Sequence, residues 1–288
     1  MLGQIFIPHA RAWRNDSLYR WLWLLAPQML ALLFIVWLFD ATPTPPVGGN
    51  SGSWWNDPNA SRNELYVLST KAATDPAAET ELRKRAETGN SEAEFYLAYF
   101  LDPLVNKNLA TDDRTRECLE WYKKSAAHGS PGAAANYGLL KAYPRGSSFP
   151  ADYAEALKYL QMAGNNPMAM RELAFMYSSG RGVPMDQKHA NELLQNAADM
   201  NDKDAQYWLG EDYDKGEHGQ PQDKAKALVL WQKSAFQGRR EAQREFGLHL
   251  FSGDGIQKNN DQAVYWLKLA ASNGDQPAQQ FLQTIHQN

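Results

Sequence analysis

The histidines and the single cysteine are the side chains with which this chain could most readily catalyse a reaction or hold a metal. The six histidines are spread along the sequence at His9, His128, His189, His218, His249 and His286. None of them forms the H-E-x-x-H or H-x-x-E-H spacing of a zinc enzyme. Cys118 lies ten residues from His128, and a lone cysteine can form neither an internal disulfide nor a cysteine-based zinc cluster. We therefore expect Cys118 to be a small buried thiol without a catalytic role.

Other motifs that would indicate an enzyme are missing from the sequence. It contains no G-x-x-x-x-G-K-[ST] phosphate loop, no G-x-S-x-G and no S-x-x-K. The segment from Asp212 to Asp223 contains several oxygen ligands and His218, but its spacing matches no EF-hand, so we expect a solvated loop. The formal net charge is −4, which is not the basic footprint of a nucleic-acid-binding protein. The sequence thus predicts no enzyme, no metal or cofactor, no small-molecule ligand and no nucleic-acid partner.

An internal repeat indicates which elements build the chain instead. An alanine recurs at Ala93, Ala133, Ala169, Ala205, Ala242 and Ala278. Four residues after each alanine stands a large side chain: Leu97, Tyr137, Leu173, Leu209, Phe246 and Leu282. Five residues after it stands a small one: Ala98, Gly138, Ala174, Gly210 and Gly247. Because positions four apart share one face of an α-helix, this pattern predicts one helix per repeat, helix A, with room for a second helix to approach closely.

The second half of each repeat predicts that second helix, helix B. Large residues recur at Trp121, Tyr159, Leu193, Trp231 and Trp266. Each is followed four residues later by a small one: Ser125, Ala163, Ala197, Ala235 and Ala270. This spacing again places both residues on one helix face. Gly129, Gly238 and Gly274 then stand where helix B is expected to end.

Paired glycines connect helix A to helix B in two of the repeats. They are Gly180 and Gly182 in the third repeat and Gly253 and Gly255 in the fifth. Glycine readily adopts the positive φ angles of a tight turn. Asp186 and Asp261 follow these pairs and are expected to cap helix B.

This arrangement resembles the Sel-one-like repeat family, which is related to the tetratricopeptide repeats. The fifth repeat carries the family motif at Ala242, Phe246, Gly247, Gly253, Gly255, Ile256, Trp266, Ala270, Ala271 and Gly274. The first two repeats lack the glycine pair. The resemblance implies an all-α, right-handed α-solenoid. Its five helix-pair repeats would span residues 91–130, 131–166, 167–202, 203–239 and 240–275, with capping helices at 61–90 and 276–288.

The N-terminal part predicts a membrane anchor. Residues 21–39 contain 19 consecutive residues without a charge, which approaches the length of a transmembrane helix. Arg11, Arg14 and Arg20 precede this span, so the positive-inside rule places residues 1–20 in the cytoplasm and the repeats in the periplasm of a bacterium. Residues 40–60, rich in Pro, Gly, Ser and Asn, would form a flexible linker. A cleaved signal peptide and a buried core helix are the alternatives for residues 21–39.

The resemblance also implies a binding face. In tetratricopeptide-like arrays the face of helix A opposite the alanine stripe lines a concave channel that holds partner proteins. Here that face, the predicted binding face, carries Phe95, Tyr99, Leu139, Arg171, Phe175, Tyr207, Glu211, Arg244, Leu248 and Phe251. Aromatic and arginine side chains are typical of interface hot spots. We expect Phe175, Tyr207 and Phe251 to be exposed, while packing between neighbouring A helices is the alternative role for the face.

We therefore expect a single-pass inner-membrane scaffold that recruits or positions envelope proteins in secretion, cell-wall or polysaccharide machinery. Its partners would be another protein or peptide and, through residues 21–39, the membrane. Two alternatives remain open at this point. One is a cell-wall or β-lactam-active enzyme. The other is a cytoplasmic-facing adaptor in membrane-protein quality control, which requires the reverse topology.

Overall fold

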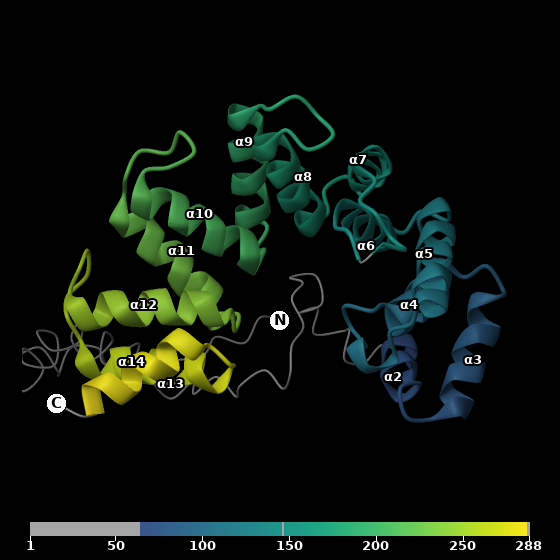
Figure 1. The fold of residues 1–288 in the computed structure, drawn as a ribbon, viewed down its shortest axis with the longest axis horizontal. Coiled ribbons are helices and arrows are strands. Elements are labelled where there is room, and N and C mark those ends of the chain that lie inside the picture. The colour runs from purple at the N-terminus through teal and green to yellow at the C-terminus, as the bar shows by residue number, and fades with distance from the viewer. Residues whose placement is uncertain (1–63, 146, 287–288) are drawn as a thin grey trace, which may run out of the picture. The chain divides into compact units, whose positions relative to one another are not determined.

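The structure, a computed structural model, describes residues 64–145 and 147–286, all of which belong to one compact unit. This part of the chain consists of α-helices, joined by turns and one short 3-10 helix (Figure 1). The helices are α2 (Glu64–Lys71), α3 (Pro76–Ala86), α4 (Ser91–Leu101), η3 (Lys107–Leu109), α5 (Asp112–Ala127), α6 (Pro131–Ala142), α7 (Tyr153–Met162), α8 (Pro167–Ser179), α9 (Gln187–Asp199), α10 (Lys203–Lys215), α11 (Lys224–Phe236), α12 (Arg240–Ser252), α13 (Asn260–Ser272) and α14 (Gln276–His286). The all-α prediction is confirmed.

The predicted N-terminal segments, 1–20, 21–39 and 40–60, lie outside the described residues. Among the residues that are described, no helix combines the length and the apolar character needed to cross a membrane.

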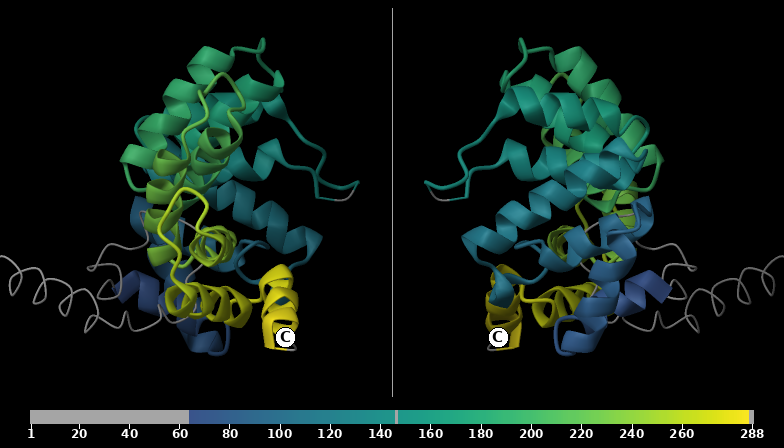
Figure 2. Two further views of the ribbon diagram at one scale, coloured as in Figure 1. Left: turned by 90° about the vertical axis from the view of Figure 1, so that its left-hand side faces the viewer. Right: turned by 90° about the vertical axis from the view of Figure 1, so that its right-hand side faces the viewer.

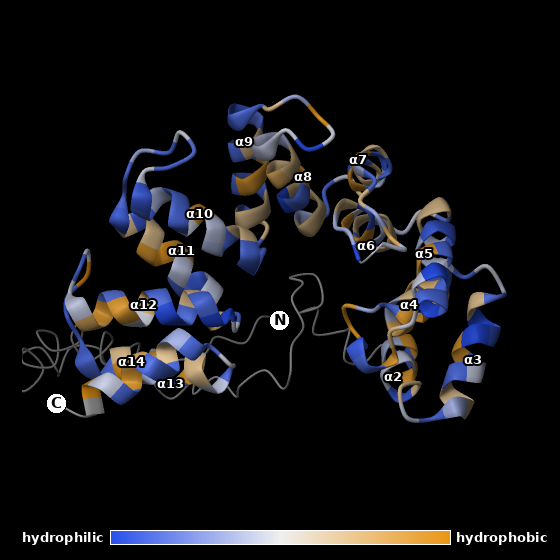
Figure 3. Cartoon of the chain, viewed as in Figure 1, coloured by the Kyte–Doolittle hydropathy of each residue, from blue (hydrophilic) through white to orange (hydrophobic). Residues whose placement is uncertain are grey.

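Helices A and B of each repeat form an antiparallel pair, and the pairs pack in sequence order. The pairs are α4 with α5, α6 with α7, α8 with α9, α10 with α11, and α12 with α13. Helix B of one pair contacts helix A of the next, and α13 contacts α14 in the same way (Figures 1 and 2). Apolar residues gather on the sides where helices meet (Figure 3). The predicted solenoid of helix pairs is therefore confirmed.

The recurring alanines lie in the first turn of the A helices. Each is at most 1% exposed and stands three residues after the N-cap of its helix. The N-cap side chain accepts a hydrogen bond from the alanine N–H in five helices, through Asn90, Ser130, Asn166, Asp202 and Asp275. Such a cap satisfies a backbone donor that the helix leaves unpaired. Arg239 is the exception, because its side chain makes no capping hydrogen bond to α12.

The small residue five positions after the alanine receives a large side chain from helix B of the same pair. A Cβ built on Gly210 would lie 2.7 Å from the indole nitrogen of Trp231. A Cβ on Gly138 would lie 2.7 Å from Cγ of Leu160. The absent side chain is therefore what allows the two helices to pack.

This contact corrects the predicted register of helix B in the fourth repeat. Trp231 occupies the position of Leu160 and Leu267, which contact the equivalent glycines, and not the position of Trp266. The small residue that follows in register is then Ser234, which is fully buried, and not Ala235. The connection between α10 and α11 is one residue longer than its counterparts, so the recurrence of a tryptophan does not give the register of this helix.

The glycines of the turns have the predicted positive φ angles, and one of the two predicted N-cap residues is corrected. Gly180, Gly182, Gly253 and Gly255 all have positive φ angles, as do Gly129, Gly238 and Gly274 beyond the B helices. Asp186 caps α9 through its side chain, as predicted. In the fifth repeat the N-cap is Asn259, and Asp261 lies in the first turn of α13.

Candidate protein-binding surface

Two arginines of the predicted binding face form ion pairs within the array of repeats. Arg171 Nε lies 3.2 Å from Asp202 Oδ1, and Arg244 Nη1 lies 2.6 Å from Asp275 Oδ2. Both carboxylates are N-caps of the next repeat. Each ion pair therefore joins one A helix to the start of the following A helix, as the alternative of packing between A helices requires.

The fourth repeat replaces this ion pair by a cation–π contact. Tyr207 stands at the position of the two arginines, and the N-cap of the next repeat is Arg239. The guanidinium carbon of Arg239 lies 4.4 Å from the centre of the Tyr207 ring. Tyr207 is consequently only 7% exposed, so the prediction that it would be exposed is wrong.

Most other members of the predicted face are also engaged by neighbouring elements. Phe95 is 4% exposed and packs on the rings of Tyr96 and Tyr122. The ring of Phe251 lies 5.2 Å from that of Phe281 on α14. Tyr99, Leu139 and Leu248 are half-buried and pack against the apolar core. Glu211 instead accepts a hydrogen bond of 2.6 Å from Lys215 of its own helix, α10.

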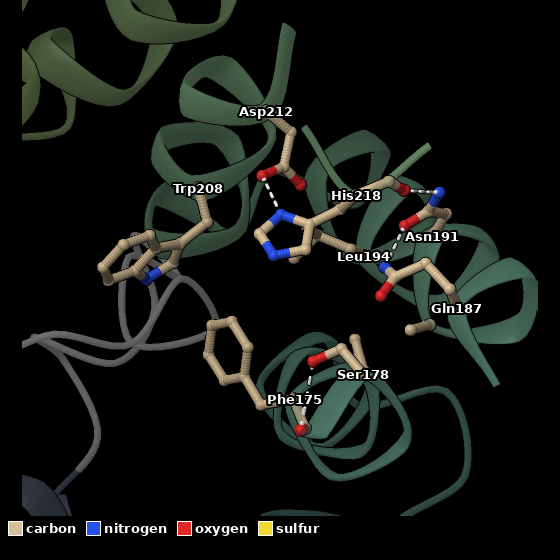
Figure 4. Close-up of a pocket in the computed structure, with 10 residues that line it drawn as sticks. Phe175, Ser178, Gln187, Asn191, Leu194, Trp208, Asp212 and His218 are labelled. Atoms are coloured by element: carbon tan, nitrogen blue, oxygen red, sulfur yellow. Dashed lines mark hydrogen bonds and ion pairs between the residues drawn. The ribbon is translucent and has the colours of Figure 1, made fainter. Parts of the chain in front are cut away.

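At Phe175 the face opens into a pocket. It lies between α8, α9, α10 and the loop that follows α10 (Figure 4). The lining residues are Ala174, Phe175, Ser178, Gln187, Ala190, Asn191, Leu194, Trp208, Asp212 and His218, and the empty volume is about 370 Å³. We call this the repeat-3/4 pocket.

The floor and one wall of the repeat-3/4 pocket are apolar. Ala174, Ala190 and Leu194 are buried and form its floor. The rings of Phe175 and Trp208 meet edge to face, with centres 6.0 Å apart. Trp208 is 40% exposed, which is high for so large an apolar side chain. The pocket therefore presents an aromatic wall to the outside.

The opposite side is polar and internally hydrogen-bonded. His218 Nδ1 lies 2.7 Å from Oδ1 of Asp212. Asn191 donates to the His218 carbonyl oxygen at 2.7 Å, and Gln187 donates to Asn191 Oδ1 at 2.8 Å. Burial raises the pKa of the Asp212 carboxyl, and the hydrogen bond with His218 opposes that rise. With Nδ1 bonded to the carboxylate, Nε2 is the ring nitrogen turned toward the pocket (Figure 4).

His218 has a backbone conformation that is unusual for its residue type. Its φ angle is 53°, in the left-handed region that costs an L-residue roughly 1–2 kcal/mol. Gly219 stands four residues before the N-cap Asp223, as Gly182 and Gly255 stand four before Asp186 and Asn259, so Gly219 is the equivalent of these glycines and His218 is the extra residue of its connection. A residue other than glycine that is held in the left-handed region is a pointer to function.

The longer connection accommodates the histidine. A Cβ built on Gly182 would lie 2.6 Å from Cβ of Tyr153 on the preceding B helix, so that loop has no space for a side chain at this glycine. The connection from Gly216 to Asp223 is one residue longer than that from Gly180 to Asp186. It contacts the preceding B helix, α9, through the hydrogen bond from Asn191 to the His218 carbonyl oxygen, and His218 has no counterpart in the third and fifth repeats.

Trp208 stands at a position of the repeat where the residue type varies. The residues three after the other repeat alanines are Tyr96, Asn136, Glu172, Glu245 and Phe281. Glu172 accepts a hydrogen bond from the Tyr143 hydroxyl at 2.9 Å, and Glu245 accepts one from Arg244. Trp208 and the inserted His218 thus line one pocket. The repeat pattern predicts neither residue, because the residue type varies at the position of Trp208 and His218 lies in an insertion.

The single cysteine, the other side chain able to do chemistry, has a structural role. Cys118 is fully buried, as predicted, and its thiol donates to the carbonyl oxygen of Ala98 at 3.3 Å. Burial raises the pKa of that thiol well above its usual range, which disfavours the reactive thiolate. Within residues 64–145 and 147–286, no three His, Cys, Asp or Glu side chains converge as a metal site.

Comparison with known families identifies the repeat. The family model of the Sel1 repeat matches residues 91–130, 131–166, 167–202, 203–238 and 240–275. These five matches together cover more than half of the chain.

Individual proteins show the same similarity over longer stretches. A Sel1 repeat protein from Oxalobacter formigenes is 26% identical, with a TM-score of 0.60 over 80% of this chain and 88% of that one. The protective antigen c5321 of uropathogenic Escherichia coli, which displays an SLR fold, is 27% identical, with a TM-score of 0.55 over 70% of this chain and 42% of that one. DAP3-binding cell death enhancer 1 of Rattus norvegicus is 26% identical over 239 residues, 79% of this chain and 46% of that protein. The chain spans less than half the length of the curated relatives it matches.

Proposed function

This chain belongs to the Sel1 repeat family, and from that premise we propose that it is a membrane-anchored scaffold that recruits another protein through its helix pairs. Sel1 repeat proteins are protein-interaction scaffolds. The observation that carries the proposal for this chain is the repeat-3/4 pocket. Its exposed Trp208 and half-buried Phe175 offer aromatic surface of the kind that dominates interface hot spots, whereas most of the predicted binding face is occupied by neighbouring elements.

The membrane part of the proposal rests on residues 21–39. Their uncharged run and the arginines before it support a retained anchor with its N-terminus in the cytoplasm. The repeats would then work in the periplasm on secretion, cell-wall or polysaccharide machinery. A reporter enzyme fused after residue 288 and active on only one side of the membrane tests this topology. Activity on the cytoplasmic side would instead favour an adaptor in membrane-protein quality control.

The proposed role is binding without catalysis. Asp212 and His218 are paired like the acid–base partners of a hydrolase triad. The serine in the same pocket, Ser178, donates its hydroxyl hydrogen to the Phe175 carbonyl oxygen at 3.2 Å. It is therefore not held as a nucleophile by His218, which argues against the alternative of a cell-wall or β-lactam-active enzyme.

Affinity capture of the full-length chain after crosslinking in its native cell tests the scaffold role. We expect a specific protein to be recovered with the unmodified chain and lost with Trp208→Glu. Glutamate already occupies the equivalent positions 172 and 245, so this substitution is compatible with the fold. Tyr265→Glu is the matched control, because Tyr265 is a 49% exposed aromatic residue away from the pocket. Failure to recover any specific protein, or equal recovery with both variants, would refute the proposal.

A further inference from the structure

We propose that the repeat-3/4 pocket binds a cationic side chain, arginine or lysine, of the partner polypeptide. This inference rests on the proposed scaffold function and names the chemistry of the group that the pocket recognises. Two independent features of the pocket lead to it: the aromatic wall and the charge balance of the polar side.

The aromatic wall suits a cation with an aliphatic stem. A guanidinium or ammonium group within about 6 Å of an indole or phenyl face is attracted by the negative face of the ring. The methylene groups of arginine and lysine can at the same time cover apolar surface. Trp208 provides the exposed ring, and the floor of Ala174, Ala190 and Leu194 provides the apolar surface.

The polar side carries an excess of negative charge. Asp212 is buried, and its hydrogen-bonding partner in the pocket is the imidazole of His218. Glu217 adds negative potential at the Asp212 carboxyl, and so does Glu211, although Glu211 is paired with Lys215. When His218 is neutral and its Nδ1–H donates to Asp212, its Nε2 is a hydrogen-bond acceptor that faces the pocket. A donor with positive charge is complementary to this side, whereas a carboxylate would be repelled.

The array already places one of its own cations on the aromatic wall. The guanidinium carbon of Arg239 lies 4.4 Å from the centre of the Tyr207 ring and 5.8 Å from that of Trp208, and Arg239 also pairs with Asp204. Trp208 nevertheless remains 40% exposed, and none of the ten residues that line the repeat-3/4 pocket is an arginine or a lysine. The contact with Arg239 thus shows that the Trp208 ring accepts a guanidinium, while its exposed surface lines the pocket.

Fluorescence polarisation with labelled peptide pools tests the inference on the full-length chain. Each pool fixes one central residue, which is arginine, lysine, norleucine, tryptophan or glutamate, between mixed flanking positions. We expect the arginine and lysine pools to bind about tenfold more tightly than the norleucine and glutamate pools, within the range of cation–π and charge-assisted contacts.

Pocket variants show whether that preference arises here. Asp212→Asn keeps the shape and removes the charge, and Trp208→Leu keeps an apolar side chain and removes the aromatic face. Each should reduce the preference for the basic pools several-fold. The control Asp254→Asn removes a carboxylate from another connection, where it pairs with Lys224, and should leave the preference unchanged.

Several outcomes would overturn the inference. Binding that does not depend on the fixed residue is one, and tightest binding of the tryptophan or glutamate pool is another. Unchanged preference in both Asp212→Asn and Trp208→Leu, or no binding of any pool, would also overturn it. None of these results concerns the recovery of a partner from cells, so the scaffold proposal stands or falls separately.

Discussion

Replacing Gly182 by alanine should destabilise the folded chain by about 2–5 kcal/mol. The φ angle of Gly182 is 72°, and an L-residue in that region costs roughly 1–2 kcal/mol. The added Cβ would also lie 2.6 Å from Cβ of Tyr153. This overlap forces the loop or α7 to move, and overpacking of this kind costs about 1–3 kcal/mol.

A control glycine separates the two contributions. Gly219 has a φ angle of 77°, close to that of Gly182, but a Cβ built on it would meet only the Asn191 side chain, at 3.7 Å. Gly219→Ala should therefore carry the backbone cost of about 1–2 kcal/mol alone. The difference between the two variants in the free energy of unfolding measures the cost of the contact between the added Cβ at position 182 and Tyr153.

Unfolding of the full-length chain in guanidinium chloride, followed by far-ultraviolet circular dichroism, provides the measurement. Because repeats can unfold locally, amide hydrogen exchange in α7 and α8 should show the same order of stability. Equal destabilisation by Gly182→Ala and Gly219→Ala, within about 0.5 kcal/mol, would refute the reasoning. It would mean that the close approach of position 182 to Tyr153 adds nothing to the backbone cost.

Three further expectations follow from the described contacts. Gly210→Ala should lower the free energy of unfolding in urea by about 1–2 kcal/mol, because overlap with the rigid indole of Trp231 exceeds the gain of about 1 kcal/mol in helix propensity. A stabilised variant would contradict the corrected register. Arg171→Met should cost about 3–5 kcal/mol by the same assay, since it leaves the buried carboxylate of Asp202 without its ion pair; a loss below about 1 kcal/mol would show that the pair does not join the repeats. Burial raises the pKa of Asp102, so the folded chain binds that proton more readily than the unfolded chain. Its contribution to the free energy of unfolding is present below about pH 4 and is lost as the pH rises through the raised folded value. Asp102→Asn should flatten this decline between pH 4 and 7, and parallel pH profiles of the two proteins would contradict the assignment.

The helix pairs could be predicted from the sequence because each depends on local chemistry that recurs. A capping side chain, an alanine three residues later and a small residue five beyond it are enough to place helix A and the partner that packs on it. The register of α11 could not be obtained in this way. A one-residue insertion leaves the apolar character of helix B unchanged, and only the contact between Gly210 and Trp231 shows which side chain is buried.

The candidate site was predictable only in part. Phe175 belongs to the predicted binding face, but periodicity cannot indicate which member of a face a neighbour will cover. Tyr207 is covered by Arg239, a residue thirty-two positions later. The residue type varies at the position of Trp208, and His218 is the extra residue of its connection, so the repeat pattern gives no expectation for either side chain. What the sequence alone does not show is that the two side chains line the same pocket.

Site-specific photocrosslinking is the most direct test of the claim that this chain recruits a protein through the repeat-3/4 pocket. Benzoylphenylalanine would replace Trp208 in the full-length chain in its native cell, with Tyr265 replaced in parallel as the exposed control. The account predicts a discrete crosslinked protein from position 208 that is missing from position 265. No adduct from position 208, or the same adducts at equal yield from both positions, would contradict it.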